Sequence, residues 1–387
     1  MSRRKNGEGS IIELENGKAT FRQPIGYLPN GNVKYKSKTF EDKETALKVS
    51  NHILLQKKRE NLIDSSNILF SDYADKWLTI HKKSMIRSST YDILENLLST
   101  HIYPIISDLQ LHSITSKDLQ KLIDDEADVL ALNTLKGLFS TLNSIFYYAY
   151  LSNDIEINPM DDVVIPFHKY PLSSESKITV LTQEEQILFF KTCFKRRKNG
   201  RLCFRHGPAL ALLLSTGMRS GELLSLQRKN INLESREINI SGTIARIKNR
   251  DKSCDSDLSY IHEIHNTKSV AGKRVIPINL WAEQAIRILE DEIYIKNDND
   301  LIFPTKTGSV YTYRVLATGF DRLLYLCNIE HRNLHCLRHS FATQMLYENE
   351  DIVSLSKILG HKSPITTYNI YIHFIDKDKE EALKLLE

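Results

Sequence analysis

The sequence of 387 residues has few cysteines and no long apolar run. Its five cysteines are an odd number and form no CxxC pair, which argues against a disulfide framework or a zinc site and suits a reducing cytosol. The longest apolar run, Ala209 to Leu214, is far too short to cross a bilayer, and Met1 to Ser10 is polar and basic, unlike a signal peptide. We therefore expect a cytoplasmic protein with no membrane partner and no bound metal.

Motifs for common cofactors are also missing. The sequence contains no Walker loop, no dinucleotide-binding glycine pattern and no HExxH motif, so we expect neither ATP nor a nicotinamide cofactor. The net charge is only +4, but residues 1–60 hold thirteen Lys and Arg against seven Asp and Glu, which is +6 and leaves 4 − 6 = −2 for the other 327 residues. A basic block at one end favours an acidic partner such as nucleic acid; the alternative is a solvated, lysine-rich surface.

Residues 1–63 predict a small α+β domain. A helix is expected at Lys43 to Asn61, and the turn dipeptides Asn16-Gly17 and Asn30-Gly31 separate three strands. The expected strands are Ser10 to Ile12, Ala19 to Pro24 and Val33 to Phe40.

Three lysines alternate along the third of these strands. Lys34, Lys36 and Lys38 are two residues apart and so should project from one face of the sheet. A basic sheet face of this kind can lie in a DNA major groove. We expect these three side chains to bind DNA.

Residues 64–68 resemble a linker, and residues 69–166 predict an all-α domain. The apolar spacing suits a bundle of four helices, of which the second and third should begin with capping residues. The expected helices are Phe70 to His81, Ser89 to His101, Thr115 to Asp125 and Asn133 to Leu151.

A second linker at 167–180 leads into a mixed, mainly α domain with a small sheet. Thr182 and Glu185 form a capping box that opens a helix. The expected strands and later helices are Ile238 to Ile247, Val275 to Ile278, Trp281 to Tyr294 and the chain from Tyr313 onward.

The first of three notable segments in this last domain is a glycine junction between two helices. An apolar helix at 209–214 is expected to stop at Gly217, and a short leucine-rich helix follows. Arg219 lies on the turn, where a rigid guanidinium suits bidentate binding of phosphate. Glu222 is placed to hold Arg219. The alternative is a structural Arg–Glu pair at a helix junction.

The second segment runs from His335 to Thr343. His335 and Arg338 are three residues apart, so on a helix they share one face. An imidazole and a guanidinium directed at one point predict a phosphate clamp; the alternative is a polar surface face. Cys336 lies between them, which suggests the hypothesis that oxidation of its thiol lowers activity.

The third segment begins at Leu359. Gly360 should end a helix, His361 follows on the turn, and Tyr371 lies ten residues later in a helical stretch. The alternative for Tyr371, one tyrosine among seventeen, is a packing residue of an amphipathic helix.

Together these segments resemble the tyrosine recombinase (phage-type integrase) family. The resemblance is carried in order by TGMRSGELLSL at 216–226, HCLRHSFAT at 335–343, LGH at 359–361 and YIH at 371–373. It implies three domains over most of the chain. Residues 1–63 resemble the arm-binding domain of integrases from temperate phages and integrative conjugative elements, 69–166 the helical core-binding domain, and 178–387 the catalytic domain.

The resemblance implies a role for each matched residue. Arg219 and Arg338 would clamp the scissile phosphate, and His335 and His361 would donate to its oxygens, with His361 also able to help deprotonate the nucleophile. Tyr371 would attack phosphorus and form a 3′-phosphotyrosine. This chemistry stabilises the charge of phosphoryl transfer without a metal.

Two assignments within the family pattern have competitors. The family also uses a lysine on a β-hairpin turn to protonate the departing 5′-oxygen; Lys268 matches by position, and Lys273 is the runner-up. Tyr368 competes as nucleophile, but Tyr371 precedes His373 as the family's Tyr-x-His does.

The resemblance also implies partners. These are double-stranded DNA attachment sites of core and arm type and a homotetramer on DNA, in the nucleoid of a bacterial host, serving integration and excision of a mobile element. An excisionase and a DNA-bending host protein are candidate accessory partners. The leucine-rich segment Asp376 to Glu387 would dock on a neighbouring protomer, or else pack on its own domain.

Three other functions remain open from the sequence. A type IB topoisomerase shares the catalytic residue set, but the arm-like and separate helical domains favour recombination. A degenerate, non-catalytic DNA-binding protein is disfavoured by the complete set of candidate catalytic residues. A helical RNA-binding module has no supporting RRM or KH signature.

Overall fold

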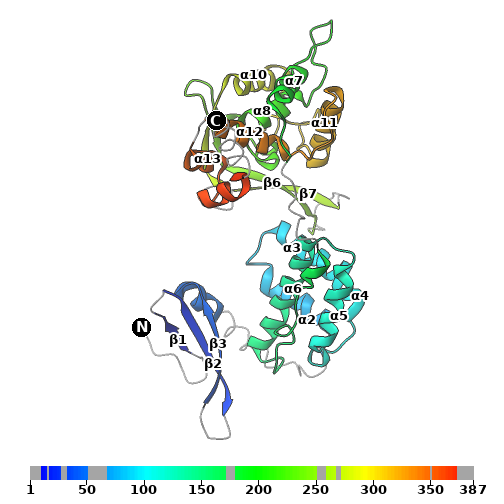
Figure 1. The fold of residues 1–387 in the computed structure, drawn as a ribbon, viewed down its shortest axis with the longest axis vertical. Helices are drawn as coiled ribbons and strands as arrows, with labels where there is room; N and C mark the ends of the chain where they lie inside the picture. Colours follow the sequence, from blue (N-terminus) through cyan, green and yellow to red (C-terminus); the bar gives the residue numbers. More distant parts are fainter. Residues whose placement is uncertain are drawn as a thin grey trace, which may run out of the picture. The chain divides into compact units, whose positions relative to one another are not determined.

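The structure is a computed structural model, and it describes residues 10–14, 17–27, 33–50, 68–170, 179–250, 259–266, 272–348 and 351–372. The chain divides into two compact units, Met1–Ser174 and Glu175–Glu387. Both appear in Figure 1, where colour follows the sequence. No helix in the described ranges is long and apolar enough to cross a membrane.

The first unit begins with the three-stranded antiparallel sheet that the turn dipeptides predict. Its strands follow the order β1-β2-β3. A helix begins at residue 43 as expected, whereas 51–67, which include the rest of the predicted helix and most of the linker, lie outside the described residues. Phe21 of β2 is buried together with Leu151, which anchors the sheet to the helical part of the same unit. The strands are β1 Ser10–Glu13, β2 Ala19–Tyr27 and β3 Val33–Phe40.

The rest of this unit is the expected helical bundle. Its core is apolar and aromatic, with Phe70 stacked on Phe146 at 5.5 Å between ring centroids. The capping residue predicted at Thr115 is confirmed, and the structure adds a capping box in which Asp118 is its partner. The cap predicted at Ser89 is wrong, because the helix begins one residue earlier and Arg87 precedes it without a side-chain cap. The helices are α2 Phe70–Lys76, α3 Ser88–Leu97, α4 Tyr103–Ile106, α5 Ser116–Ala127 and α6 Leu132–Ser152.

The second unit is built around one buried helix. Every residue of α8 (Gly207–Thr216) is buried, and α7, α10 and α12 pack against it. An apolar sequence with no polar face predicts such a central helix. The capping box at Thr182 and Glu185 opens α7 as predicted. The other helices are α7 Gln183–Cys193, α9 Ser220–Leu224, α10 Leu280–Ile288, α11 Tyr313–Leu326, α12 Cys336–Tyr347 and α13 Ile352–Leu359, followed by a helical stretch at 364–372.

The prediction of a single strand at Ile238 to Ile247 is wrong. This segment forms two strands, and each pairs with different partners. β5 (Glu237–Ile240) pairs with β4 (Ile231–Asn232) and β8 (Arg274–Pro277), whereas β6 (Gly242–Lys248) pairs with β7 (Tyr260–Asn266). β5 buries Ile238 and Ile240 in the core, while β6 and β7 form a separate hairpin at the edge of this unit (Figure 1). The hairpin's second strand escaped prediction because its sequence is polar.

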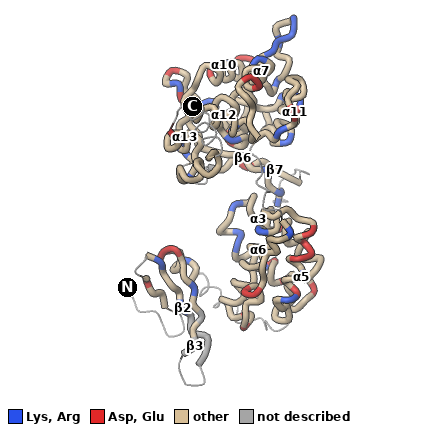
Figure 2. Tube along the Cα trace, viewed as in Figure 1, with Lys and Arg blue, Asp and Glu red and all other residues tan. Residues whose placement is uncertain are grey.

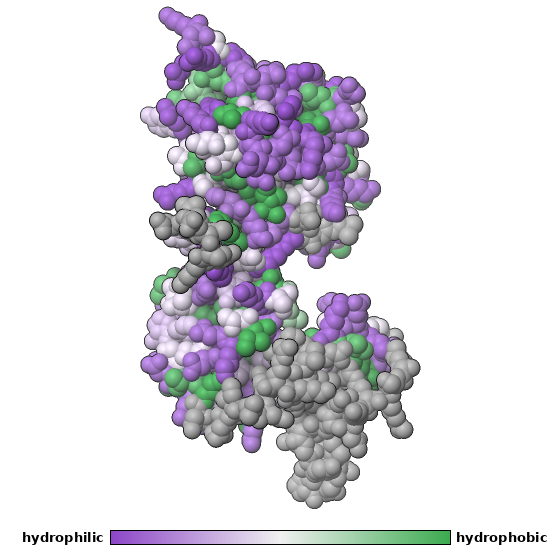
Figure 3. Space-filling model, turned by 180° about the vertical axis from the view of Figure 1, so that it is seen from behind, coloured by the Kyte–Doolittle hydropathy of each residue, from purple (hydrophilic) through white to green (hydrophobic). Residues whose placement is uncertain are grey.

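Charged residues gather locally on both units. Figure 2 shows a basic loop between α7 and α8, where residues 195–201 include five Lys and Arg, and an acidic stretch along α5. The view of Figure 3 shows a mostly hydrophilic surface on the second unit, with hydrophobic residues in small patches. Basic residues are thus not confined to the N-terminal sixty.

Gly217 and Gly200 offer a matched test of backbone strain. Both have positive φ, +62° and +78°, but a Cβ on Gly217 would lie 2.3 Å from the Phe341 ring, whereas Gly200 has nothing within 4 Å. Gly200→Ala should lower the free energy of unfolding by about 1–2 kcal/mol, the cost of a left-handed conformation. Gly217→Ala should lower the free energy of unfolding by about 1–3 kcal/mol more than Gly200→Ala does, because its Cβ would overpack against the Phe341 ring. Urea unfolding of both variants measures this, and equal losses would contradict the predicted clash.

Candidate active site

Arg219 lies at the corner that the sequence predicts. Gly217 ends α8 in a left-handed conformation, and Arg219 directly precedes α9. Its guanidinium donates to Oε1 of Glu222 at 3.0 Å, and its backbone N–H donates to Oε2 at 2.8 Å. The Arg219 side chain is 41% exposed and that of Glu222 only 5%. The predicted Arg219–Glu222 contact is therefore confirmed, and it leaves part of the guanidinium facing solvent.

Arg274 is a buried partner of Glu222 that the sequence did not predict. Its two Nη atoms donate to the two oxygens of Glu222 at 2.9 and 2.8 Å, and its Nε donates to the backbone oxygen of Ile358. Burial alone would raise the pKa of Glu222, but Arg274 and then Arg219 outweigh it, and the pKa is lowered. Arg274 is 52 residues from Glu222 in sequence, so no local spacing reveals the pair.

Arg338 lies in the interior, where it joins all three notable segments. Only 3% of it is exposed. Its guanidinium donates to the backbone oxygens of Gly217 and Leu359, both at 2.8 Å, and to Nε2 of His361 at 3.0 Å. Burial, together with the charge of Arg219, lowers the pKa of Arg338 to about 9. Arg338 therefore stays charged at neutral pH.

His361 follows the left-handed Gly360 on the predicted turn. A guanidinium can only donate, so Nε2 of His361 must accept from Arg338. The proton of the neutral ring then sits on Nδ1, which lies 2.8 Å from the Thr367 hydroxyl. Burial, and next the charge of Arg338, lowers the pKa of His361 to about 4. In this state His361 offers no Nε2–H, contrary to the expectation that it donates to phosphate.

Two histidines, His335 directly before α12 and His339 within it, connect this cluster to Tyr371. His335 stands at the start of the helix, and its ring meets that of His339 at 90° with 4.8 Å between centroids. Partial desolvation, then Arg338 and Arg219, lowers the pKa of His335. Nδ1 of His339 lies 2.8 Å from the hydroxyl of Tyr371. His339 lies within the motif at 335–343, but the sequence predicted no role for it.

The two competing tyrosines differ sharply in environment. Tyr371 is 1% exposed, whereas Tyr368 is 42% exposed. Burial raises the pKa of Tyr371 to about 12, against an opposing effect of Arg338. Only Tyr371 is brought by the fold beside the arginine and histidine residues, whereas Tyr368 faces solvent.

The structure describes the side chains of only some of the candidate lysines. Lys268, like His373 and Asp376 to Glu387, lies outside the described residues, while Lys273 is exposed just before β8. The side chains of Lys34 and Lys36 are likewise not described. Nζ of Lys38 lies 3.7 Å from the ring centroid of Tyr147 on α6, and burial, with the charge of Lys82, lowers its pKa. Lys38 therefore packs within its own unit rather than projecting into solvent.

Cys336, the first residue of α12, is completely buried. Burial raises the pKa of its thiol to about 12. Because the thiolate is the reactive form, a buried thiol with a high pKa is inert. The structure therefore argues against the hypothesis that oxidation of Cys336 controls activity.

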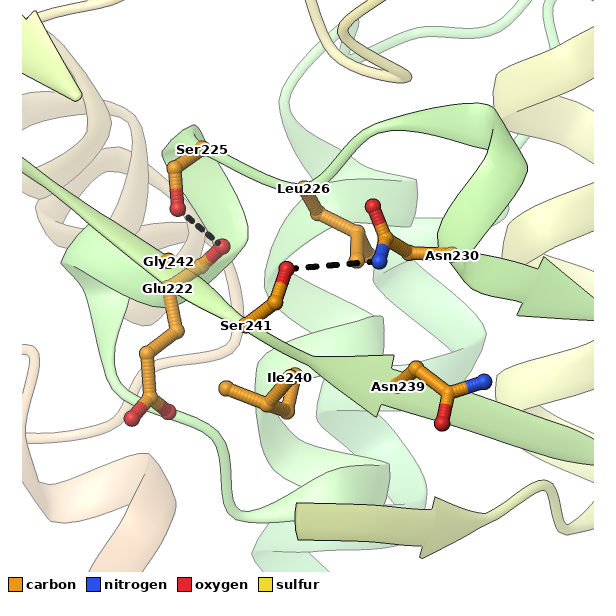
Figure 4. Close-up of a pocket in the computed structure, with 8 residues that line it drawn as sticks. All are labelled: Glu222, Ser225, Leu226, Asn230, Asn239, Ile240, Ser241 and Gly242. Carbon is orange, nitrogen blue, oxygen red and sulfur yellow. Dashed lines mark hydrogen bonds between the residues drawn. The ribbon is translucent and has the colours of Figure 1, made fainter. Parts of the chain in front are cut away.

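A pocket of about 10 Å³ lies behind Glu222, between α9 and the strands β5 and β6 (Figure 4). Its walls are joined by hydrogen bonds from Ser225 to the backbone oxygen of Glu222 and from Asn230 to Ser241. This volume holds about one water molecule, so the pocket is no substrate site. Over the described ranges, no three His, Cys, Asp or Glu side chains are grouped so that they could hold a metal ion.

Known proteins resemble this chain over both units. Residues 180–378 match the model of the phage integrase family, and residues 70–164 match the phage integrase central domain. A XerC-like tyrosine recombinase of Caldanaerobacter subterraneus is 26% identical over 65% of this chain and 65% of its own length. The integrase of Staphylococcus phage L54a is 25% identical over 86% of this chain and 98% of its own.

A solved structure shares the fold. The Tn1549 transposon integrase in complex with transposon right end DNA has a TM-score of 0.64 and 21% identity to this chain. The match covers 83% of this chain and all of the other. The multidomain architecture with a mainly α domain and small antiparallel sheets is thus confirmed.

The ion pair of Arg274 with Glu222 predicts a pH-dependent stability. Glu222→Gln should lower the free energy of unfolding at neutral pH by about 3–5 kcal/mol, because the buried guanidinium of Arg274 loses its counter-charge. The pKa of Glu222 is lower in the folded state, so its stabilisation is complete above its unfolded pKa of about 4.3 and is lost as pH falls further. Urea unfolding from pH 7 to pH 3 should show the difference from wild type shrinking below about pH 4.

Glu283 provides a control for this measurement. It pairs with Arg287 on the surface at 2.8 Å. Glu283→Gln should change the free energy of unfolding by about 0–1 kcal/mol. A Glu222→Gln effect no larger than this, or one independent of pH, would contradict the prediction.

Proposed function

The chain belongs to the phage integrase family, and we propose on this basis that it is a site-specific tyrosine recombinase. It cleaves and rejoins DNA strands through a 3′-phosphotyrosyl intermediate. The observation that carries the proposal is the convergence of Arg219, Arg338, His335 and Tyr371, which are spread over more than 150 residues of the sequence. Such a set can bind a phosphodiester and attack it.

The two arginines act on the scissile phosphate. Arg219 is partly exposed, so its guanidinium can donate to an oxygen of a phosphate that binds at the surface. Arg338 is buried and supplies positive charge from the interior side of the site. His335 adds an imidazole at the same place. Charge spread over the phosphate oxygens in the transition state is stabilised by such preorganised donors. Glu222 holds Arg219 in position through the contacts described above.

Tyr371 is the proposed nucleophile. Its hydroxyl oxygen attacks phosphorus, the bond to the 5′-oxygen breaks, and the protein becomes attached to the 3′ end. A lysine at 268, or alternatively Lys273, protonates the departing oxygen. Because the phosphotyrosine retains the energy of the broken bond, the 5′-hydroxyl of another strand can reverse the step. Once its hydrogen bond to Arg338 is exchanged, His361 donates to a phosphate oxygen or helps to deprotonate Tyr371.

The remaining proposals concern domains and partners. Residues 1–63 bind arm-type DNA sites with Lys34 and Lys36, residues 69–166 bind the core site, and residues 178–387 carry out catalysis. Two linked DNA-binding modules raise the effective concentration at a composite site. The active assembly is a tetramer on DNA that integrates and excises a mobile element, with an excisionase and a DNA-bending host protein as accessory partners.

Covalent trapping tests the nucleophile. The purified chain is incubated with a library of nicked duplexes whose core sequence is randomised, and the captured DNA is sequenced while the attached peptide is mapped. We expect an adduct on Tyr371 that is lost in Tyr371→Phe and kept in Tyr368→Phe. An adduct on Tyr368 would overturn the assignment, and DNA binding without any adduct would favour the non-catalytic alternative.

Arg219 is tested with a duplex recovered in that selection. Arg219→Ala should slow adduct formation by about 10²–10³-fold, the usual effect of removing one donor to the transition state. The matched control is Arg236→Ala, which removes a surface arginine that pairs with Glu283 at 3.2 Å. Single-turnover rates of both variants decide the matter, and similar rates for the two would contradict the role of Arg219.

A further inference from the structure

We propose that His339 accepts the proton of the Tyr371 hydroxyl during strand cleavage. The proposal rests on the proposed function, since it takes Tyr371 as the nucleophile. It adds a catalytic residue to the set that the sequence motifs identify, because His339 touches the reacting oxygen itself.

The contact has the geometry of a hydrogen bond between nucleophile and base. Nδ1 of His339 lies 2.8 Å from the hydroxyl oxygen of Tyr371, and the two rings meet at 64° with 5.7 Å between centroids. A general base must come within about 2.6–3.2 Å of the atom from which it takes the proton. When Nδ1 accepts, the neutral ring carries its own proton on Nε2. The hydroxyl then donates its proton to Nδ1, and its oxygen is the atom that attacks phosphorus.

The other histidines of the cluster are less suited to this task. Both ring nitrogens of His361 are engaged, Nε2 by Arg338 and Nδ1 by the Thr367 hydroxyl. The ring of His335 packs on the ring of His339. His339 thus stands between His335 and Tyr371 in a row of rings.

The proton balance of the step is complete. The Tyr371 oxygen forms a bond to phosphorus, its proton moves to Nδ1 of His339, and the P–O5′ bond breaks. The departing 5′-oxygen takes a proton from the proposed lysine, so the strand ends as a free 5′-hydroxyl. In rejoining, the imidazolium of His339 returns its proton to the tyrosine oxygen. No metal or other reactant enters the balance.

Electrostatics explain why the proton transfer from Tyr371 to His339 requires bound DNA. Burial, followed by the charges of His335 and Arg338, lowers the pKa of His339 to about 4 in the chain alone. A phosphodiester beside Arg338 brings a negative charge that opposes this effect and stabilises an imidazolium. The proton therefore leaves Tyr371 as the bond to phosphorus forms, when the phenol oxygen loses its basicity.

Two substitutions separate proton acceptance from positioning. His339→Ala removes both, whereas the amide oxygen of His339→Asn can take the place of Nδ1 as a hydrogen-bond acceptor without holding a proton. Both should slow formation of the Tyr371 adduct by about 10²–10⁴-fold. The same exchange at an exposed histidine, His331→Asn, is the control and should leave the rate unchanged.

A second readout uses the nucleophile itself. Placing 3-fluorotyrosine at position 371 lowers the pKa of the phenol and so lessens its need for a base. We expect this replacement to raise the adduct rate more in His339→Asn than in the chain with His339. Because this comparison uses His339→Asn and the chain with His339, the proposal stays testable even where His339→Ala does not fold.

Each outcome decides for or against His339. Wild-type adduct rates in His339→Asn would reduce His339 to a positioning residue and overturn the proposal. Unchanged or faster rates in His339→Ala would do the same, the latter indicating that His339 restrains Tyr371. Failure of the proposed function is distinct, because the wild-type chain would then form no adduct at Tyr371 at all. Binding of each variant to the selected duplex confirms that the site is intact.

Discussion

A buried cation at the meeting point of helix ends organises this site. Arg338 donates to the carbonyl oxygens of Gly217, just after α8, and Leu359, the last residue of α13. Carbonyl groups at a helix C-terminus lack partners within the helix and carry partial negative charge, so they can solvate a guanidinium that burial would otherwise destabilise. Arg219 and His361 each lie two residues beyond one of these carbonyls. Holding Arg338 therefore places both of them.

A second network ends at the same turn of the chain. Arg274 binds Glu222 with both Nη atoms and the backbone oxygen of Ile358 with its Nε. The end of α13 is thus held at two neighbouring carbonyl groups, that of Ile358 by Arg274 and that of Leu359 by Arg338. Within this described network three guanidiniums face a single carboxylate, which leaves net positive charge. The fold accepts this imbalance, and a bound phosphodiester would relieve it, which is how a preorganised anion site is expected to be built.

The sequence predicted what local patterns determine. Apolar periodicity, capping residues and glycine turns located the helices, and Gly217 and Gly360 end theirs as expected. It could not predict contacts between distant segments. Arg274 and His339 gained their roles only from neighbours 52 and 32 residues away. The break at Ser241 was missed for the same reason: continuous β propensity does not reveal that two halves of a run pair with different strands.

The state of Tyr371 follows from the balance of these forces. A tyrosine beside Arg338 could be expected to ionise easily, but burial has the larger effect and raises its pKa to about 12. The phenol therefore keeps its proton in the chain alone, and the surrounding histidines stay neutral because burial and the arginines lower their pKa values. The proposed nucleophile and the neighbouring histidines are thus held close together in their neutral forms. Because an added anion opposes the effect of the arginines on the histidines, the proposed chemistry is coupled to the arrival of the phosphate.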